Sequence, residues 1–239
     1  MKSWWSMMVV LSSGVLGCST MRMAVPEELQ QQQVMEWPVG RNVPLFGQGT
    51  LSFGPYGARK YGRGWSSTTS LSIGPATVYE GSEPYEFQLH AEDAAPRPVA
   101  CQSLLKGHDV DLSFMLDGLS AGAAERRLVC DIGAEGKLAL AELPAYADPY
   151  STKVVGRLRM GGVNLDVEST HRTQQGARIL FAGFEIRHEQ RTVAAVQTIN
   201  GGHVWMAGDL APEVRAGVAM VASSVLLHGH WNGGADSRP

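Results

Sequence analysis

The chain has 239 residues, a formal net charge of −3 and three cysteines. This balance excludes an extended basic surface of the kind that binds nucleic acid. The densest basic stretch, Arg59, Lys60 and Arg63, lies among glycines, and we interpret it as a solvated turn. We expect no nucleic-acid partner and no cofactor.

The N-terminus has the layout of an export signal. Lys2 supplies a positive charge, residues 4–16 are mostly apolar, and Gly17 precedes Cys18. The apolar run is too short to cross a bilayer, which takes about 20 residues. Two interpretations stay open: a signal that is cut before Cys18, or an ordinary secretory signal with an incidental cysteine.

The sequence VLGC, which ends at Cys18, resembles the lipobox of bacterial lipoproteins. The resemblance implies that residues 1–17 are a signal peptide and that the thiol of Cys18 carries a diacylglyceryl group. Acyl chains contribute about 0.8 kcal/mol per buried methylene, so such an anchor is effectively permanent. Because Ser19 replaces the aspartate of inner-membrane lipoproteins, the resemblance favours the outer membrane of the bacterial envelope, facing the periplasm or the surface.

If Cys18 carries lipid, Cys101 and Cys130 are left as a pair. An oxidising compartment would allow them to form a disulfide. The bond would close a loop of about 30 residues and stabilise the fold by roughly 3.5 kcal/mol in the chain-entropy model. The alternative is two separate buried thiols.

Residues 18–44 are predicted to be the lipidated cysteine and a tether. Pro26, followed by Glu27 and Glu28, indicates a short helix ending near Glu36, while the four glutamines are equally typical of a disordered segment. A flexible tether would hold the domain a few tens of Å from the membrane.

Residues 45–231 are predicted to form a single β-rich domain, and 232–239 a flexible tail. Short alternating segments punctuated by glycine and proline indicate an antiparallel barrel or sandwich of about ten to twelve strands, and no helix-length segments separate them as a parallel sheet requires. The clearest alternation is at 109–116. Further strands are predicted at 65–73, 85–91, 98–102, 127–132, 153–160, 163–170, 178–187, 191–199 and 203–207.

One hydrophobic helix is predicted at the C-terminal end. Pro212 and Glu213 suit its first turn, and the run from Ala216 to Leu227 contains no charge. Its apolar side chains cover nearly the whole circumference, so the helix has almost no face suited to water. We expect either a sheet that curls around it or packing on one sheet face.

Residues 183–227 resemble the closing strands and terminal helix of the tubby-like superfamily, which includes scramblase-related and LURP-one-related proteins. The matching features are a strand pair joined near Glu189 and Gln190, a strand containing Trp205, and the apolar helix. The resemblance implies a closed antiparallel sheet of about twelve strands around that helix. The phosphoinositide-binding lysines of eukaryotic members have no counterpart, so no functional residue is carried over.

The stretch GLSAG matches the nucleophile elbow Gly-x-Ser-x-Gly with Ser120 at its centre. An elbow needs a following helix, for which the next residues leave barely one turn, so we interpret the stretch as a hairpin or loop. The alternative is a serine hydrolase that uses Ser120, with Asp166 or Asp209 and His228 completing a triad.

His228 and His230 are candidate metal ligands, but zinc requires three or four ligands and no third is evident. Asp109, Asp111 and Asp117 lack the spacing of a calcium loop and indicate a solvated strand face. We therefore predict a non-enzymatic binding or structural domain that contacts the membrane through Cys18, with an unknown protein or lipid ligand.

Overall fold

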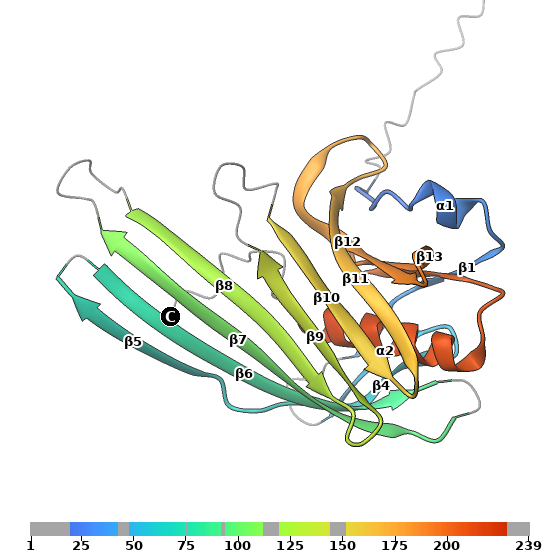
Figure 1. Cartoon of the computed structure of the whole chain (residues 1–239), viewed down its shortest axis with the longest axis horizontal. Helices are drawn as coiled ribbons and strands as arrows, with labels where there is room; N and C mark the ends of the chain where they lie inside the picture. Colours follow the sequence, from blue (N-terminus) through green and yellow to red (C-terminus); the bar gives the residue numbers. More distant parts are fainter. Residues whose placement is uncertain are drawn as a thin grey trace, which may run out of the picture.

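Strands of one antiparallel sheet make up most of the protein. The computed structural model describes residues 20–42, 48–74, 76–91, 94–111, 120–143 and 152–228. The sheet has fourteen strands, with the order β1-β14-β13-β12-β11-β10-β9-β8-β7-β6-β4-β3-β2, and β5 pairs with β6 outside this path. The predicted fold class, mainly β with an antiparallel barrel or sandwich and one hydrophobic C-terminal helix, is confirmed, and the sheet forms a nearly closed barrel with more strands than the ten to twelve expected (Figure 1).

The elements follow one another along the chain as α1 (Glu27–Gln30), β1 (Val34–Pro38), β2 (Gly40–Asn42), β3 (Gly49–Phe53), β4 (Tyr56–Arg63), β5 (Ser67–Ile73), β6 (Ala76–His90), β7 (Arg97–Asp111), β8 (Ser120–Asp131), β9 (Gly136–Leu143), β10 (Lys153–Met160), β11 (Val163–Arg172), β12 (Arg178–His188), β13 (Arg191–Gln197), β14 (His203–Ala207) and α2 (Pro212–His228).

The sheet is nearly closed by the short strands near the N-terminus. β1 is at one end of the sheet path and pairs with β14, and β2 is at the other end and pairs with β3. Only Val39 separates β1 from β2, and its amide donates a hydrogen bond to the carbonyl of Gly202 at 3.2 Å. One almost continuous extended segment therefore bridges both ends of the curled sheet.

The interior of this sheet is filled by α2. Every residue from Ala216 to His228 is buried, and the helix contacts β4, β6, β10, β11 and β14. A Cβ atom added at Gly217 would lie 3.0 Å from a side-chain carbon of Leu165 and 3.3 Å from one of Leu158, so the missing side chain allows close approach to β10 and β11. The helix, which is apolar on nearly all sides, is therefore in contact with apolar side chains of the surrounding sheet.

Polar side chains donate hydrogen bonds to backbone carbonyls in the buried C-terminal turns of α2. The Tyr85 hydroxyl donates to the carbonyl of Ser224 at 2.9 Å, and Arg63 Nη2 donates to the carbonyl of Leu227 at 3.4 Å. Such partners are needed because the last carbonyls of a helix have no amide donor within it. Burial raises the pKa of Tyr85 well above its ordinary value, so the phenol stays a donor.

Four strands extend past the barrel as a projecting sheet, which we call the wing and define as residues 67–73, 76–84, 102–111 and 120–127 (Figure 1). β6 and β7 pair from Ala76 and Val110 at the far end to Leu89 and Arg97 in the barrel. β8 pairs with β9 only from Arg127 onward. Every residue of β5 is exposed, so the wing has no core of its own at this edge.

Several predicted strands are confirmed and one segment is corrected. β10 and β14 have the predicted bounds, whereas β7 ends at Asp111 and residues 112–119 lie outside the described part. The helix predicted to end near Glu36 ends at Gln30, because the next residues pair with β14. Residues 34–38 and 40–42 thus lie in strands of the sheet, within the range expected to be a tether.

Replacement of Val221 by Asp tests the enclosure of α2. Val221 is fully buried, so Val221→Asp would place a carboxylate among apolar side chains and lower the free energy of unfolding by several kcal/mol, comparable with the whole stability of such a domain. The control is Glu213→Gln at the exposed start of the same helix. Urea unfolding of both variants measures the effect, and an unchanged midpoint for Val221→Asp would contradict the enclosure.

Candidate functional site

The candidate nucleophile Ser120 lies at the start of a strand. Ser120 is the first residue of β8 and is paired in register with Asp111 of β7. A nucleophile elbow presents its serine at the N-terminus of a helix, which helps to form the oxyanion hole. The strand that runs on to Asp131 does not supply this element.

The proposed triad partners lie apart from one another. Asp166 lies on β11 and binds Arg157, with Oδ1 2.6 Å from the guanidinium Nε. Asp209 precedes α2 whereas His228 is its last residue, so the 17-residue helix separates them by about 25 Å. The structure therefore does not bring these four residues together as a triad.

The other candidate ligands are also dispersed. His228 is buried at the end of α2, while Asp109 and Asp111 lie on β7; His230 and Asp117 are outside the described residues. Across the described ranges, no three His, Cys, Asp or Glu side chains are grouped as metal ligands. In the same part of the chain, no helix has the length and apolarity needed to cross a membrane.

Cys101 and Cys130 are joined where the wing leaves the barrel. Their sulfur atoms are 2.03 Å apart, and the two residues are directly opposite in the register of β7 and β8. Both are buried, and Ser224 of α2 lies against Cys130, with its Oγ 3.6 Å from the sulfur. The predicted pairing is thus seen, and it links two long strands of the wing beside the central helix.

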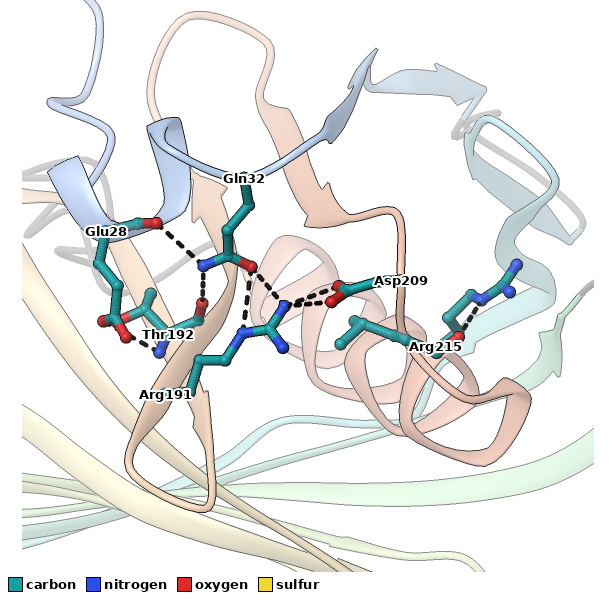
Figure 2. A network of polar contacts seen from close by, with 7 residues as sticks. Glu28, Gln32, Arg191, Thr192, Asp209 and Arg215 are labelled. Carbon is teal, nitrogen blue, oxygen red and sulfur yellow. Dashed lines mark hydrogen bonds and ion pairs between the residues drawn. The ribbon is translucent and has the colours of Figure 1, made fainter.

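A polar network holds the N-terminal segment against the barrel, centred on Arg191 of β13 (Figure 2). Arg191 Nη2 donates to both carboxylate oxygens of Asp209, at 2.6 and 2.9 Å, and to Gln32 Oε1 at 2.5 Å. Gln32 Nε2 donates in turn to the carbonyl of Thr192 at 3.2 Å. Glu28 Oε2 accepts from the Thr192 amide at 3.1 Å. The residues of α1 and just after it are therefore bonded to both β13 and the approach to α2.

Hydrogen bonds in this network lower two carboxyl pKa values. The bonds from Thr192 hold the pKa of Glu28 below its ordinary value, and the bond from Arg191 does the same for the pKa of Asp209. A carboxyl whose pKa is lowered by folding stabilises the fold above its unfolded pKa, near pH 4, and loses that contribution as the pH falls through its folded pKa. The network is thus complete at neutral pH and weakened in acid.

The chain is already fixed at Met23, before α1. Met23 is fully buried, its amide donates to Gln197 Oε1 at 2.9 Å, and it forms an antiparallel bridge with Thr173. No sequence signal pointed to these contacts, since Met23 and Gln197 are 174 positions apart. The segment that follows Cys18 by only a few residues is consequently part of the folded domain.

A charged groove lies on the outer face of β9 to β12. Its volume is about 620 Å³, and it is lined by Lys137, Arg157, Arg159, Asp166, Glu168, Glu185 and Arg187 among others. Asp166 pairs with Arg157, and Arg187 lies 3.4 Å from Glu185. Burial raises the pKa of Glu185, and the nearby Arg187 guanidinium reduces this rise without cancelling it. The acidic lining residues are therefore largely neutralised within the groove.

Two cations of the groove are neighbours on adjacent strands. Arg159 and Lys137 are directly opposite in the register of β10 and β9. Lys137 is also directly opposite Asp131 of β8, whose carboxylate offsets part of the like-charge repulsion between the two cations.

Comparison with known protein families, with curated proteins and with solved structures finds no match to this chain.

Removal of the Arg191 guanidinium tests the role of the network. Arg191→Gln should speed hydrogen exchange of the amides in α1, because this change removes the bonds to Asp209 and alters those to Gln32. Global stability should fall by at most about 1 kcal/mol, since the ion pair is partly exposed.

The matched control is Arg157→Gln, which removes a comparably exposed ion pair with Asp166 on the outer face. Exchange in α1 should be unaffected by this variant. Equal exchange rates in both variants would mean that the network does not hold the N-terminal segment.

Proposed function

We propose that this protein is a lipid-anchored protein of the bacterial envelope, whose β domain binds a partner or has a structural role and carries out no catalysis. The observation that supports this most is that the chain's own helix fills the interior of the sheet. Ligand-binding barrels keep such an interior open for their ligand. Here Val218, Val221 and the residues between them are fully buried, so recognition has to use the exterior.

The exterior offers two surfaces for recognition: the wing, with β5 exposed along its whole length, and the charged groove beside β10. The candidate catalytic residues are spread over several elements, and both candidate aspartates are in ion pairs unrelated to a triad. Ser120 begins β8 and Asp166 pairs with Arg157, while Asp209 pairs with Arg191. This distribution favours binding over hydrolysis.

The anchor rests on the lipobox-like sequence that ends at Cys18, and the contacts of Met23 fit it. A chain attached to lipid at Cys18 and bonded to the barrel from Met23 onward would hold the domain close to the membrane.

Metabolic labelling with a palmitate analogue tests the anchor. The wild-type protein should be labelled and recovered in the membrane fraction, and Cys18→Ser should be neither. Thr20→Ala serves as the control, because it changes a nearby residue and keeps the thiol. Equal labelling of wild type and Cys18→Ser would remove the lipoprotein proposal.

A fluorophosphonate probe tests the absence of catalysis in the same preparations. An activated serine reacts with such a probe, so the native protein should remain unlabelled. Labelling that disappears in Ser120→Ala would instead establish a serine hydrolase.

A further inference from the structure

The point at which the N-terminal segment meets the barrel lies at one defined end of the sheet. Met23 bridges Thr173, immediately after β11, and Ala24 donates to the carbonyl of Arg172 at 3.0 Å. Asn200, between β13 and β14, donates to the carbonyl of Met21. The chain from Cys18 to Met23 spans less than about 18 Å even when fully extended. A lipid on Cys18 would therefore keep this end, which we call the anchor end, within that distance of the bilayer.

The strand order shows which other strand ends lie at the same edge of the sheet as the anchor end. Consecutive strands from β5 to β14 are antiparallel neighbours. In such a series the last residues of β5, β7, β9, β11 and β13 lie at the same end as the first residues of the strands that follow them. The far end of the wing is thus at the anchor end of the sheet.

The exposed large apolar side chains of the described residues gather at this end. They are Met21 beside Asn200, Leu71 and Ile73 at the end of β5, Val78 near the start of β6, Leu143 at the end of β9 and Leu180 near the start of β12; Trp65, at the base of the wing, is the exception. Leu71 and Val78 are directly opposite in register and are 62% and 51% exposed. Ile73 is 71% exposed.

β5 and the start of β6 are uncharged where these side chains lie, whereas Asp109 and Asp111 of β7 are at the same end of the wing. The sequence from Gly64 to Tyr79 contains no charged residue, and the first ion pair inward from the tip among the described residues joins Glu80 to Lys106 at 2.7 Å. The opposite end of the sheet is charged, with Arg97 paired to Glu135 at 3.1 Å. Entry into lipid is costly for charged groups and favourable for apolar ones, so we confine the contact with lipid to the edge of the wing that β5 and the start of β6 form.

We propose that the anchor end faces the lipid bilayer and that Leu71, Ile73 and Val78 at the far end of the wing enter its interface. The inference rests on the proposed function, because lipidated Cys18 brings the bilayer to this end. A planar lipid surface is the occupant that fits, since the apolar side chains are spread over four separate strands and the N-terminal segment rather than lining one groove. The wing then acts as a second contact that fixes the orientation of the anchored domain.

Depth-sensitive fluorescence on the full-length lipidated protein tests this orientation. Ile73→Cys, at an exposed position, accepts an environment-sensitive nitrobenzoxadiazole label, while the native cysteines are lipidated or joined as a disulfide. The matched control is Ala134→Cys, exposed in the turn between β8 and β9 at the opposite end. Both proteins are reconstituted in phosphatidylethanolamine and phosphatidylglycerol vesicles that contain a lipid with a nitroxide on its acyl chain.

The label at position 73 should shift its emission to the blue and lose intensity to the nitroxide lipid, and the label at position 134 should do neither. Equal responses at the two positions in a protein that floats with the vesicles would overturn the orientation and leave the anchor intact. Failure to float would overturn the anchor and the orientation together. Protection of position 73 from aqueous iodide without nitroxide quenching would overturn the bilayer as occupant and indicate a protein partner, such as a second copy.

Discussion

Burial of α2 inside the curled sheet is the interaction on which the rest of the structure depends. Its apolar side chains cover the whole circumference, and each fully buried Val, Leu or Met contributes about 1.5–3 kcal/mol that would be lost on exposure. A flat sheet could cover only one side of such a helix. Contacts with β4 and β6 on one part of the sheet and with β10, β11 and β14 on another therefore require the sheet to curl. The bridging segment of β1 and β2 follows from this curvature, since it lies where the two ends of the sheet approach.

For the binding role that we propose, the same burial would direct recognition to the outside of the molecule. With the interior occupied, the surfaces left for a partner are the wing, the charged groove and the anchor end. The Arg191 network and the burial of Met23 connect the first of the described residues to the barrel, so an anchor at Cys18 would act on a rigid body. Such a short connection would limit the orientations of an anchored domain, in contrast to the long tether that composition suggested.

The parts of the fold that the sequence predicted are those with a local pattern. α2 has first-turn residues that suit a helix and an uncharged run, β10 and β14 were recognisable as short strands, and the parity of the cysteines indicated the pair that the structure joins. The length of the wing was missed because Gly107 interrupts the pattern of β7. Tyr79 lies across that glycine, where its ring occupies the space that a Cβ atom would take. β1 was missed because its pairing with β14 is a contact between distant parts of the chain.

The candidate site was less predictable for the same reason. Gln32 and Arg191 are 159 positions apart, and nothing in either neighbourhood indicates the other. The residues that local motifs did single out, Ser120 above all, depended on a helix that the surrounding strand pairing does not allow. The network around Arg191 arises only once the sheet has curled and brought α1 against β13.

Native-state hydrogen exchange of the full-length protein tests the central claim most directly. If α2 is the core around which the sheet closes, its amides from Val218 to Val225 should exchange only through global unfolding, with the same free energy of opening as the amides of β10 and β11. The exposed strand β5 should open at a much lower free energy. Exchange of the α2 amides through a local opening, while β10 and β11 stay protected, would contradict the account.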